Sequence, residues 1–235
     1  MKPNPIFVAL DTPDLSRALD IAKAARPFVG GLKVGLEFIT ALGPAGVKQI
    51  VAIGLPVFAD VKFHDIPNTV AGAAREVAKL GVAMFNVHAL GGQAMLRAAK
   101  DAALSIDPKV KVIGVTALTS LVEHDLRATG QGESVVGQVE RLAALAKQSG
   151  LDGVVCSPRE ISAVRGICGP DFVIVAPGIR AAGADPADQR RVMGPREAIG
   201  AGAHILVIGR PITGASDPGA AARAIAEDVA ETIAA

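Results

Sequence analysis

The sequence predicts an eight-stranded (β/α)8 barrel of the TIM type, and two observations lead to this fold. The chain has 235 residues, which is long for one small domain and short for two, whereas such a barrel typically needs about 250 residues. Eight short, almost wholly apolar runs alternate with segments of helical periodicity, as in parallel strands covered on both faces. We therefore predict one domain over residues 1–235. A doubly wound open sheet, which usually has fewer strands, is the alternative.

The eight apolar runs, in chain order, give the predicted strands at residues 6–10, 31–35, 56–62, 82–88, 111–118, 152–157, 172–178 and 204–209. The segments between them place apolar residues on one helical face. In the first helix this face comprises Leu15, Ala18, Leu19, Ala22 and Ala25. In the third helix it comprises Val70, Ala73, Ala74, Val77 and Leu80, and in the last helix Ile225, Val229 and Ile233.

Helix boundaries are marked by capping residues and glycines. Thr12-Pro13 and Asp217-Pro218 each read as a helix N-cap followed by proline in the first helical position. Gly81 and Gly150 read as helix stops.

The longest connection runs from Thr119 to about Glu133 and is polar and glycine-containing. It follows the fifth predicted strand, so it belongs to the face of the barrel where strands end. We expect it to be a loop and a candidate lid.

Composition excludes several classes of protein. Lys and Arg number 24 against 23 Asp and Glu, and the seven aromatic residues are all Phe, which argues against a nucleic-acid partner. No stretch of 18 apolar residues is free of charge, so no membrane span is expected, and the early apolar run is too short for a signal peptide. Cys156 and Cys168 form neither a disulfide framework nor a zinc site. We expect a soluble cytoplasmic protein.

Charged residues of alternating sign gather at the ends of the first three predicted strands: Asp11, Lys33, Asp60, Lys62 and Asp65. Chemistry in these barrels occurs at the C-terminal ends of the strands. Because Asp60 and Lys62 are two residues apart, both side chains point to the same face. An ion-pair cluster at the rim is the structural alternative for any one residue, but the five together predict a functional site.

A phosphate site is predicted at the ends of the last two strands. Barrels often bind phosphate with the loops after strands seven and eight and a following short helix. This region contains Arg180, Gly209 and Arg210. Two arginines can bind a phosphate dianion through bidentate hydrogen bonds. The alternative is that each arginine is a surface charge. Gln189 is uninformative on spacing alone.

The sequence shows no sign of a bound metal or cofactor. No trio of His, Asp and Glu has metal-ligand spacing, and Gly91-Gly92 lacks the spacing of a dinucleotide fingerprint. His88 is better explained as a hydrogen-bonded structural histidine than as a base or ligand.

The run FADVKFHDIPNT at residues 58–69 resembles the Asp-x-Lys-x-x-Asp signature of the orotidine 5'-phosphate decarboxylase family. Further segments resemble that family in order along the whole chain, namely VALDTP, GLKVGLE, VHALGG, VTALTS, APGIR and VIGRPIT. The resemblance implies a barrel that converts orotidine 5'-phosphate (OMP) to UMP and CO2 in pyrimidine biosynthesis, with no cofactor and no metal.

The resemblance also implies roles for individual residues. Lys62 is the catalytic lysine, and Asp60 is set against the carboxylate of the substrate. Asp65, also catalytic, and Thr69 reach the substrate held by the neighbouring subunit, which makes a homodimer the working form. The remaining substrate-binding residues are Asp11 and Lys33 at the ribose, Thr119 at the pyrimidine, and Arg180, Gln189, Gly209 and Arg210 at the phosphate.

Two alternatives remain open at this point. Related sugar-phosphate decarboxylases and aldol-type synthases share the Asp-x-Lys-x-x-Asp pattern, use magnesium and carry an acidic metal ligand after strand two, where Glu37 lies. A non-catalytic sensor of phosphate ligands would explain Arg180 and Arg210 but leaves the charged cluster without a purpose.

Overall fold

The computed structural model describes residues 4–180 and 193–234, without the side chains of residues 231–234. Eight parallel strands close into one barrel in the order β1 to β8, and β8 pairs with β1. The predicted (β/α)8 fold is therefore confirmed, and the open sheet is excluded. The strands are β1 (Ile6–Ala9), β2 (Gly31–Val34), β3 (Val57–Phe63), β4 (Met84–His88), β5 (Lys111–Val115), β6 (Gly153–Val155), β7 (Val173–Ala176) and β8 (Ile205–Ile208).

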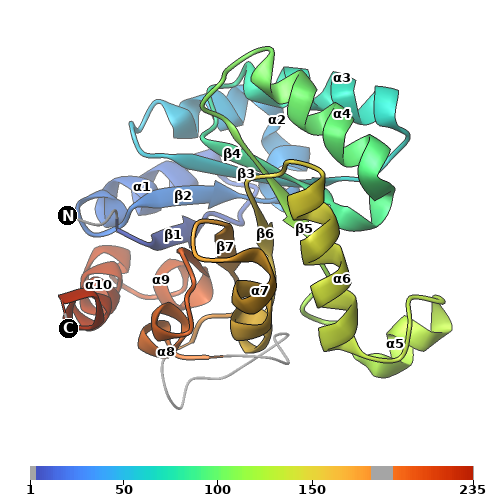
Figure 1. Cartoon of the computed structure of the whole chain (residues 1–235). Helices are drawn as coiled ribbons and strands as arrows, with labels where there is room; N and C mark the ends of the chain where they lie inside the picture. The colour runs from blue at the N-terminus through green and yellow to red at the C-terminus, as the bar shows by residue number, and fades with distance from the viewer. Residues whose placement is uncertain (1–3, 181–192, 235) are drawn as a thin grey trace.

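Helices surround the strands, and α3 packs beside α4 (Figure 1). The described α-helices are α1 (Leu15–Ala25), α2 (Leu36–Val51), α3 (Pro67–Ala78), α4 (Gly92–Leu104), α5 (Glu123–Ala128), α6 (Val135–Gln148), α7 (Ile161–Cys168), α8 (Pro195–Gly200), α9 (Arg210–Thr213) and α10 (Pro218–Ala234). Three short 3₁₀ helices are η1 (Arg26–Phe28), η2 (Ala89–Gly91) and η3 (Pro158–Glu160). Among the described residues, no helix is long and apolar enough to cross a membrane.

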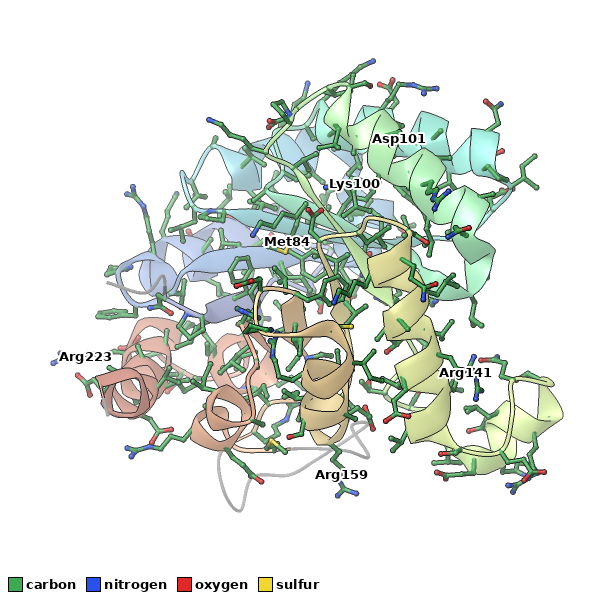
Figure 2. The ribbon with its side chains drawn as sticks, viewed as in Figure 1. Met84, Lys100, Asp101, Arg141, Arg159 and Arg223 are labelled. Carbon is green, nitrogen blue, oxygen red and sulfur yellow. The ribbon has the colours of Figure 1, made fainter. Side chains whose placement is uncertain are left out.

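The core has two layers because successive strand residues point to opposite faces. The layer inside the barrel includes Phe7, Phe58, Met84, Ile113 and Val175. The layer between strands and helices is larger and contains most of the buried aliphatic residues. Figure 2 shows Met84 at the centre of the ribbon, whereas the charged side chains of Arg159 and Arg223 lie at the periphery. Each buried Leu, Ile, Val or Phe contributes about 1.5–3 kcal/mol.

The helical faces follow the predicted period with small differences. In α1, Ala18, Ala22 and Ala25 are buried as expected, and Ile21 joins them, while Leu15 and Leu19 are only partly buried. In α3 the buried residues are Val70, Ala74, Val77 and Ala78, and Ala73 and Leu80 are partly exposed. In α10, Val229 is buried and Ile225 packs against the core, whereas the side chain of Ile233 lies outside the described residues.

One of the two predicted N-caps is wrong. Helix α1 begins at Leu15, and its N-cap is Asp14, whose carboxylate accepts the Arg17 N–H. The Thr12 hydroxyl instead accepts the Asp14 N–H, at 3.3 Å. Asp14 is the cap because its carboxylate is a charged acceptor, which the helix N-terminus favours.

The remaining helix boundaries agree with the sequence. The carboxylate of Asp217 accepts the Ala220 N–H at the start of α10, with Pro218 in the first position. Gly150 has a φ of 81° directly after the C-cap of α6, and Gly81 has a φ of 80° shortly after α3. These left-handed conformations suit glycine at a helix stop.

The connection from Thr119 to Glu133 is not a plain loop, because it contains α5. Asp125 accepts the Val122 N–H at 3.0 Å, and Leu126 is fully buried, so a short helix is both capped and anchored. Figure 1 shows α5 projecting from the barrel beside the end of α6. Arg141 of α6, labelled in Figure 2, donates to the Gln131 carbonyl at 3.1 Å. The lid function of this segment stays a prediction.

Candidate active site

A cavity of about 510 Å³ opens at the C-terminal ends of the barrel strands. Its apolar floor comes from the inner layer of the core and includes Phe58, Val115, Val155, Val175 and Val207. Its polar wall contains eight of the residues predicted from the sequence: Asp11, Lys33, Asp60, Lys62, Thr119, Arg180, Gly209 and Arg210. The cavity therefore combines an apolar base with charge at its mouth, as expected for a small-molecule site.

Four of these side chains form a continuous chain of ion pairs across β1, β2 and β3. Lys33 Nζ lies 2.8 Å from Asp11 Oδ2 and 3.4 Å from Asp60 Oδ2. Lys62 Nζ lies 2.6 Å from Asp60 Oδ1. The signs alternate along the chain from Asp11 to Lys62, so each cation is compensated. Lys33 and Asp60 at the centre are largely buried, whereas the Asp11 side chain at one end is 44% exposed. Asp60 and Lys62 do share a face, as their spacing predicts.

The end of β3 is irregular where Asp60 and Lys62 lie. Ala59 pairs with Phe85 and Phe63 pairs with Val87, so residues 60–62 of β3 stand opposite Asn86 alone. Lys62 has a φ of 52°, a left-handed conformation that costs a residue other than glycine about 1–3 kcal/mol. Its N–H donates to Asn86 Oδ1 at 2.7 Å. The surrounding strands therefore hold Lys62 in an unfavourable backbone conformation at the cavity wall.

Asn86 was not predicted from the sequence. It is fully buried, and its Nδ2 donates to Asp60 Oδ1 at 2.6 Å. The one sequence signal is an amide in the otherwise apolar run VAMFNVH, two residues before His88 and therefore on the same face.

Opposing effects set the pKa of Asp60. Burial raises the pKa, but the positive charges of Lys33 and Lys62 and the hydrogen bonds from Lys62 and Asn86 outweigh burial. The net result is a pKa below the ordinary 3.8, so Asp60 is a carboxylate at neutral pH.

His88 lies at the end of β4, and its ring centroid is 5.5 Å from that of His64. Burial lowers the pKa of His88 from 6.5, the charges of His64 and Lys62 lower it further, and Asp60 partly opposes them. A neutral imidazole therefore stands next to the ion-pair chain at pH 7.

The cavity wall at the ends of β7 and β8 carries the two predicted phosphate-binding arginines, and β8 is the neighbour of β1 in the closed barrel. Arg180 follows β7, is buried, and donates to the Ile179 carbonyl at 2.8 Å. Arg210 is the first residue of α9, directly after Gly209. Thr119 lines the same cavity. Gln189 lies outside the described residues.

Asp65 and Thr69 are exposed and are not among the described residues that line the cavity. The Asp65 carboxylate accepts the Ile66 N–H at 2.6 Å. Asp65 therefore does not join the ion-pair chain of its own subunit, contrary to one expectation from the strand ends. The reason is that β3 ends at Phe63, and Asp65 already belongs to the turn into α3.

The possible magnesium ligand Glu37 is exposed in the first turn of α2. Among the residues that the structure describes, no three His, Cys, Asp or Glu side chains gather in a way that could hold a metal ion.

Comparisons with known proteins agree with this geometry. The model of the "Orotidine 5'-phosphate decarboxylase / HUMPS family" matches residues 4–225. A Moorella thermoacetica protein named orotidine 5'-phosphate decarboxylase is 57% identical over 230 residues, covering 95% of this chain and 91% of that protein. A Rhodospirillum rubrum protein of the same name is 51% identical, covering 97% and 95%.

Solved structures with the same name are also similar. The Lactobacillus acidophilus structure has a TM-score of 0.84 and 39% identity, covering 96% of this chain and 99% of the other. The Pyrococcus horikoshii structure has a TM-score of 0.79 and 27% identity, again covering 96% and 99%.

Proposed function

The chain belongs to the orotidine 5'-phosphate decarboxylase / HUMPS family, and we propose that its cavity converts OMP to UMP and CO2, with Lys62 as the reacting side chain. This carboxy-lyase reaction is a step of pyrimidine biosynthesis. The observation that carries the proposed site is the chain of alternating charges from Asp11 to Lys62, which lines the same cavity as Arg180 and Arg210.

The reaction needs a localised positive charge. When the bond from carbon 6 of the pyrimidine to the carboxylate breaks, the electron pair stays on carbon 6 in the ring plane, where the ring carbonyls delocalise it poorly. A fixed ammonium stabilises that pair electrostatically. Lys62 then transfers a proton to carbon 6, which completes the C–H bond of UMP, and takes a proton back from water. No cofactor is needed in this scheme.

Asp60 has two functions in this proposal. Its carboxylate lies 2.6 Å from Lys62 Nζ and holds the ammonium at the cavity wall by charge and hydrogen bonding. Asp60 also faces the carboxylate of the substrate, where like charges disfavour the bound ground state. The preorganised ammonium is the main source of the rate enhancement in this proposal.

The other residues bind parts of the substrate that do not react. Arg180 and Arg210, with Gly209 and Gln189, hold the phosphate; Asp11 and Lys33 hold the ribose hydroxyls; Thr119 contacts the pyrimidine. Binding energy from the phosphate is available to close the segment from Thr119 to Glu133 and to position the ring, so it raises turnover as well as affinity.

The working form in this proposal is a homodimer of single-domain subunits in the cytoplasm. Asp65 and Thr69 are exposed next to Ile66, an apolar side chain that is 66% exposed. The exposure of Asp65 and Thr69 leaves both side chains accessible to a second copy, which supports the role that the resemblance implies for them in the neighbouring site. Cys156 and Cys168 are both present as buried thiols, which supports a reducing compartment.

An absorbance assay tests the proposed reaction, because OMP and UMP absorb differently. The purified protein should turn over OMP in the presence of EDTA at the same rate as in its absence. Inhibition by EDTA that magnesium reverses would instead assign the chain to the magnesium-dependent relatives. Tight UMP binding without turnover of OMP would indicate a phosphate-ligand sensor.

A further inference from the structure

Asn86 is a buried amide with no place in the scheme above. It lies on β4 between Met84 and His88, on the inward face of the barrel, and its exposed fraction is 0%. Burying an amide is unfavourable unless its polar atoms are hydrogen-bonded. The oxygen and the nitrogen of this amide both form hydrogen bonds with residues of the ion-pair chain.

The two contacts fix the amide in one orientation. Asn86 Oδ1 accepts the backbone N–H of Lys62 at 2.7 Å, and Asn86 Nδ2 donates to Asp60 Oδ1 at 2.6 Å. A backbone N–H only donates and a carboxylate only accepts, so rotating the amide by 180° would break both hydrogen bonds. The same Asp60 oxygen accepts from Lys62 Nζ at 2.6 Å, which closes a small network around the lysine.

The register of the strands explains why a side chain is needed here. Three residues of β3, including Asp60 and Lys62, stand opposite Asn86 of β4. The regular ladder is interrupted, and the amide bonds to the main chain of β3 in its place. Lys62 is the one described residue other than glycine with a positive φ, a conformation that persists only when its surroundings hold it.

From this geometry we propose that Asn86 is a positioning residue for the decarboxylation, which fixes the backbone of Lys62 and the carboxylate of Asp60 so that the ammonium faces the cavity. The inference rests on the proposed function of the cavity. Asn86 is not among the described lining residues, so it acts through Lys62 and Asp60 and does not touch the substrate.

Two variants separate the contacts. Asn86→Leu has a similar size and removes both hydrogen bonds. Asn86→Asp keeps an acceptor for the Lys62 N–H but sets a second carboxylate against Asp60. Two such carboxylates raise the pKa of one of them, and only the protonated form can donate to Asp60. The other groups around this pair are Lys33, Lys62 and His88.

The assay measures kcat and KM for OMP between pH 5.5 and pH 8.5, together with thermal unfolding of each variant. Asn86→Leu should lower kcat about 100-fold with little change in KM, because a displacement of about 1 Å at a reacting group has that effect. Asn86→Asp should lose activity at pH 8 and regain part of it towards pH 6, whereas Asn86→Leu should show no recovery.

Ser149→Ala is the matched control, because it removes a different buried hydrogen bond, from Ser149 Oγ to the Leu145 carbonyl at 2.7 Å. It should leave kcat and its pH profile unchanged. If both Asn86 variants lose only thermal stability and keep the wild-type kcat and pH profile, Asn86 is merely structural and the inference is wrong. Wild-type protein that does not turn over OMP would overturn the proposed function instead.

Discussion

Asp60 is the centre of the charge balance at the cavity, because it touches both lysines and Asn86. Removing one partner from a desolvated ion pair leaves the other charge uncompensated, which costs more than the pair itself contributes. The two lysines are therefore held at the cavity mouth by a carboxylate that must stay ionised.

The free energy of unfolding at low pH should depend on the ionisation of Asp60. The pKa of Asp60 is lowered below 3.8 in the folded state. Its contribution to folding is therefore fully present above pH 3.8 and is lost as the pH falls through the lower folded pKa. Wild type should be more stable than Asp60→Asn at pH 7, and the difference should shrink below pH 3.8. Urea unfolding of both proteins from pH 7 to pH 3 measures it, and a constant difference would contradict the assignment.

His88 should be neutral at pH 7. Burial lowers its pKa below 6.5 and Asp60 partly opposes the shift, so Asp60→Asn should lower the pKa further. The unfolded chain then binds protons more readily than the folded chain below pH 6.5, and acidification through this range should destabilise the protein. NMR titration of the imidazole gives the pKa directly. A value above 6.5, or an upward shift in Asp60→Asn, would disagree with this environment.

The sequence predicted the four members of the ion-pair chain, because strand periodicity alone places Asp60 and Lys62 on one face and strand ends at one rim. It did not predict Asn86 or the left-handed backbone of Lys62. Both depend on the register between β3 and β4, and a register shift leaves no trace in the order of residue types. Asp65 was misassigned to its own subunit's cluster because it lies beyond the end of β3, where strand periodicity no longer gives the direction of a side chain, and its carboxylate instead accepts the Ile66 N–H in the turn into α3.

Asp11 follows β1 and Lys33 lies on β2. Gly35, directly after β2, leaves room for the contact between their side chains. A Cβ at Gly35 would lie 2.5 Å from Asp11 Oδ1 and 2.9 Å from Lys33 Nζ. Both atoms are ends of flexible side chains, so Gly35→Ala should fold but displace the pair. We expect KM for OMP to rise about 10-fold, equivalent to roughly 1.4 kcal/mol of binding.

Gly166→Ala in α7 is the control for this substitution, since a Cβ there meets nothing within 4 Å. It should leave KM unchanged and stabilise the helix by about 0.5–1 kcal/mol. Steady-state kinetics and thermal unfolding separate the two effects. An unchanged KM in Gly35→Ala would show that Asp11 and Lys33 do not bind substrate.

The strands were predicted more accurately than the helix boundaries. Short apolar runs rich in β-branched residues are typical of strands buried on both faces in a parallel sheet, and their regular alternation with helical segments located them. The start of α1 was misplaced because Thr12 and Asp14 are both good caps, and only the path of the chain decides between them. Helix α5 was missed because its polar sequence contains one buried anchor, Leu126.

The barrel was predicted from the chain length and from the alternation of apolar strands with helical segments, since eight strand–helix units close into one sheet. The assembly of subunits did not follow from those features. The exposed positions of Asp65 and Thr69 agree with the predicted role in a neighbouring site.

Mixed dimers test whether the site is shared. Lys62→Ala and Asp65→Ala should each be inactive alone. After subunit exchange, half of the dimers are mixed, and one of the two sites in each mixed dimer has both residues intact. Activity should therefore return to about a quarter of the wild-type value. Absence of rescue, with exchange confirmed by mass spectrometry, would count against a site built from two subunits.

Turnover of OMP by wild type and Lys62→Ala, measured side by side with EDTA present, decides whether the lysine ammonium performs the reaction. Since Lys62 both stabilises the carbanion and delivers the proton, kcat should fall by at least about 10⁴-fold while UMP still binds. A Lys62→Ala protein that decarboxylates OMP at the wild-type rate would contradict the proposed mechanism.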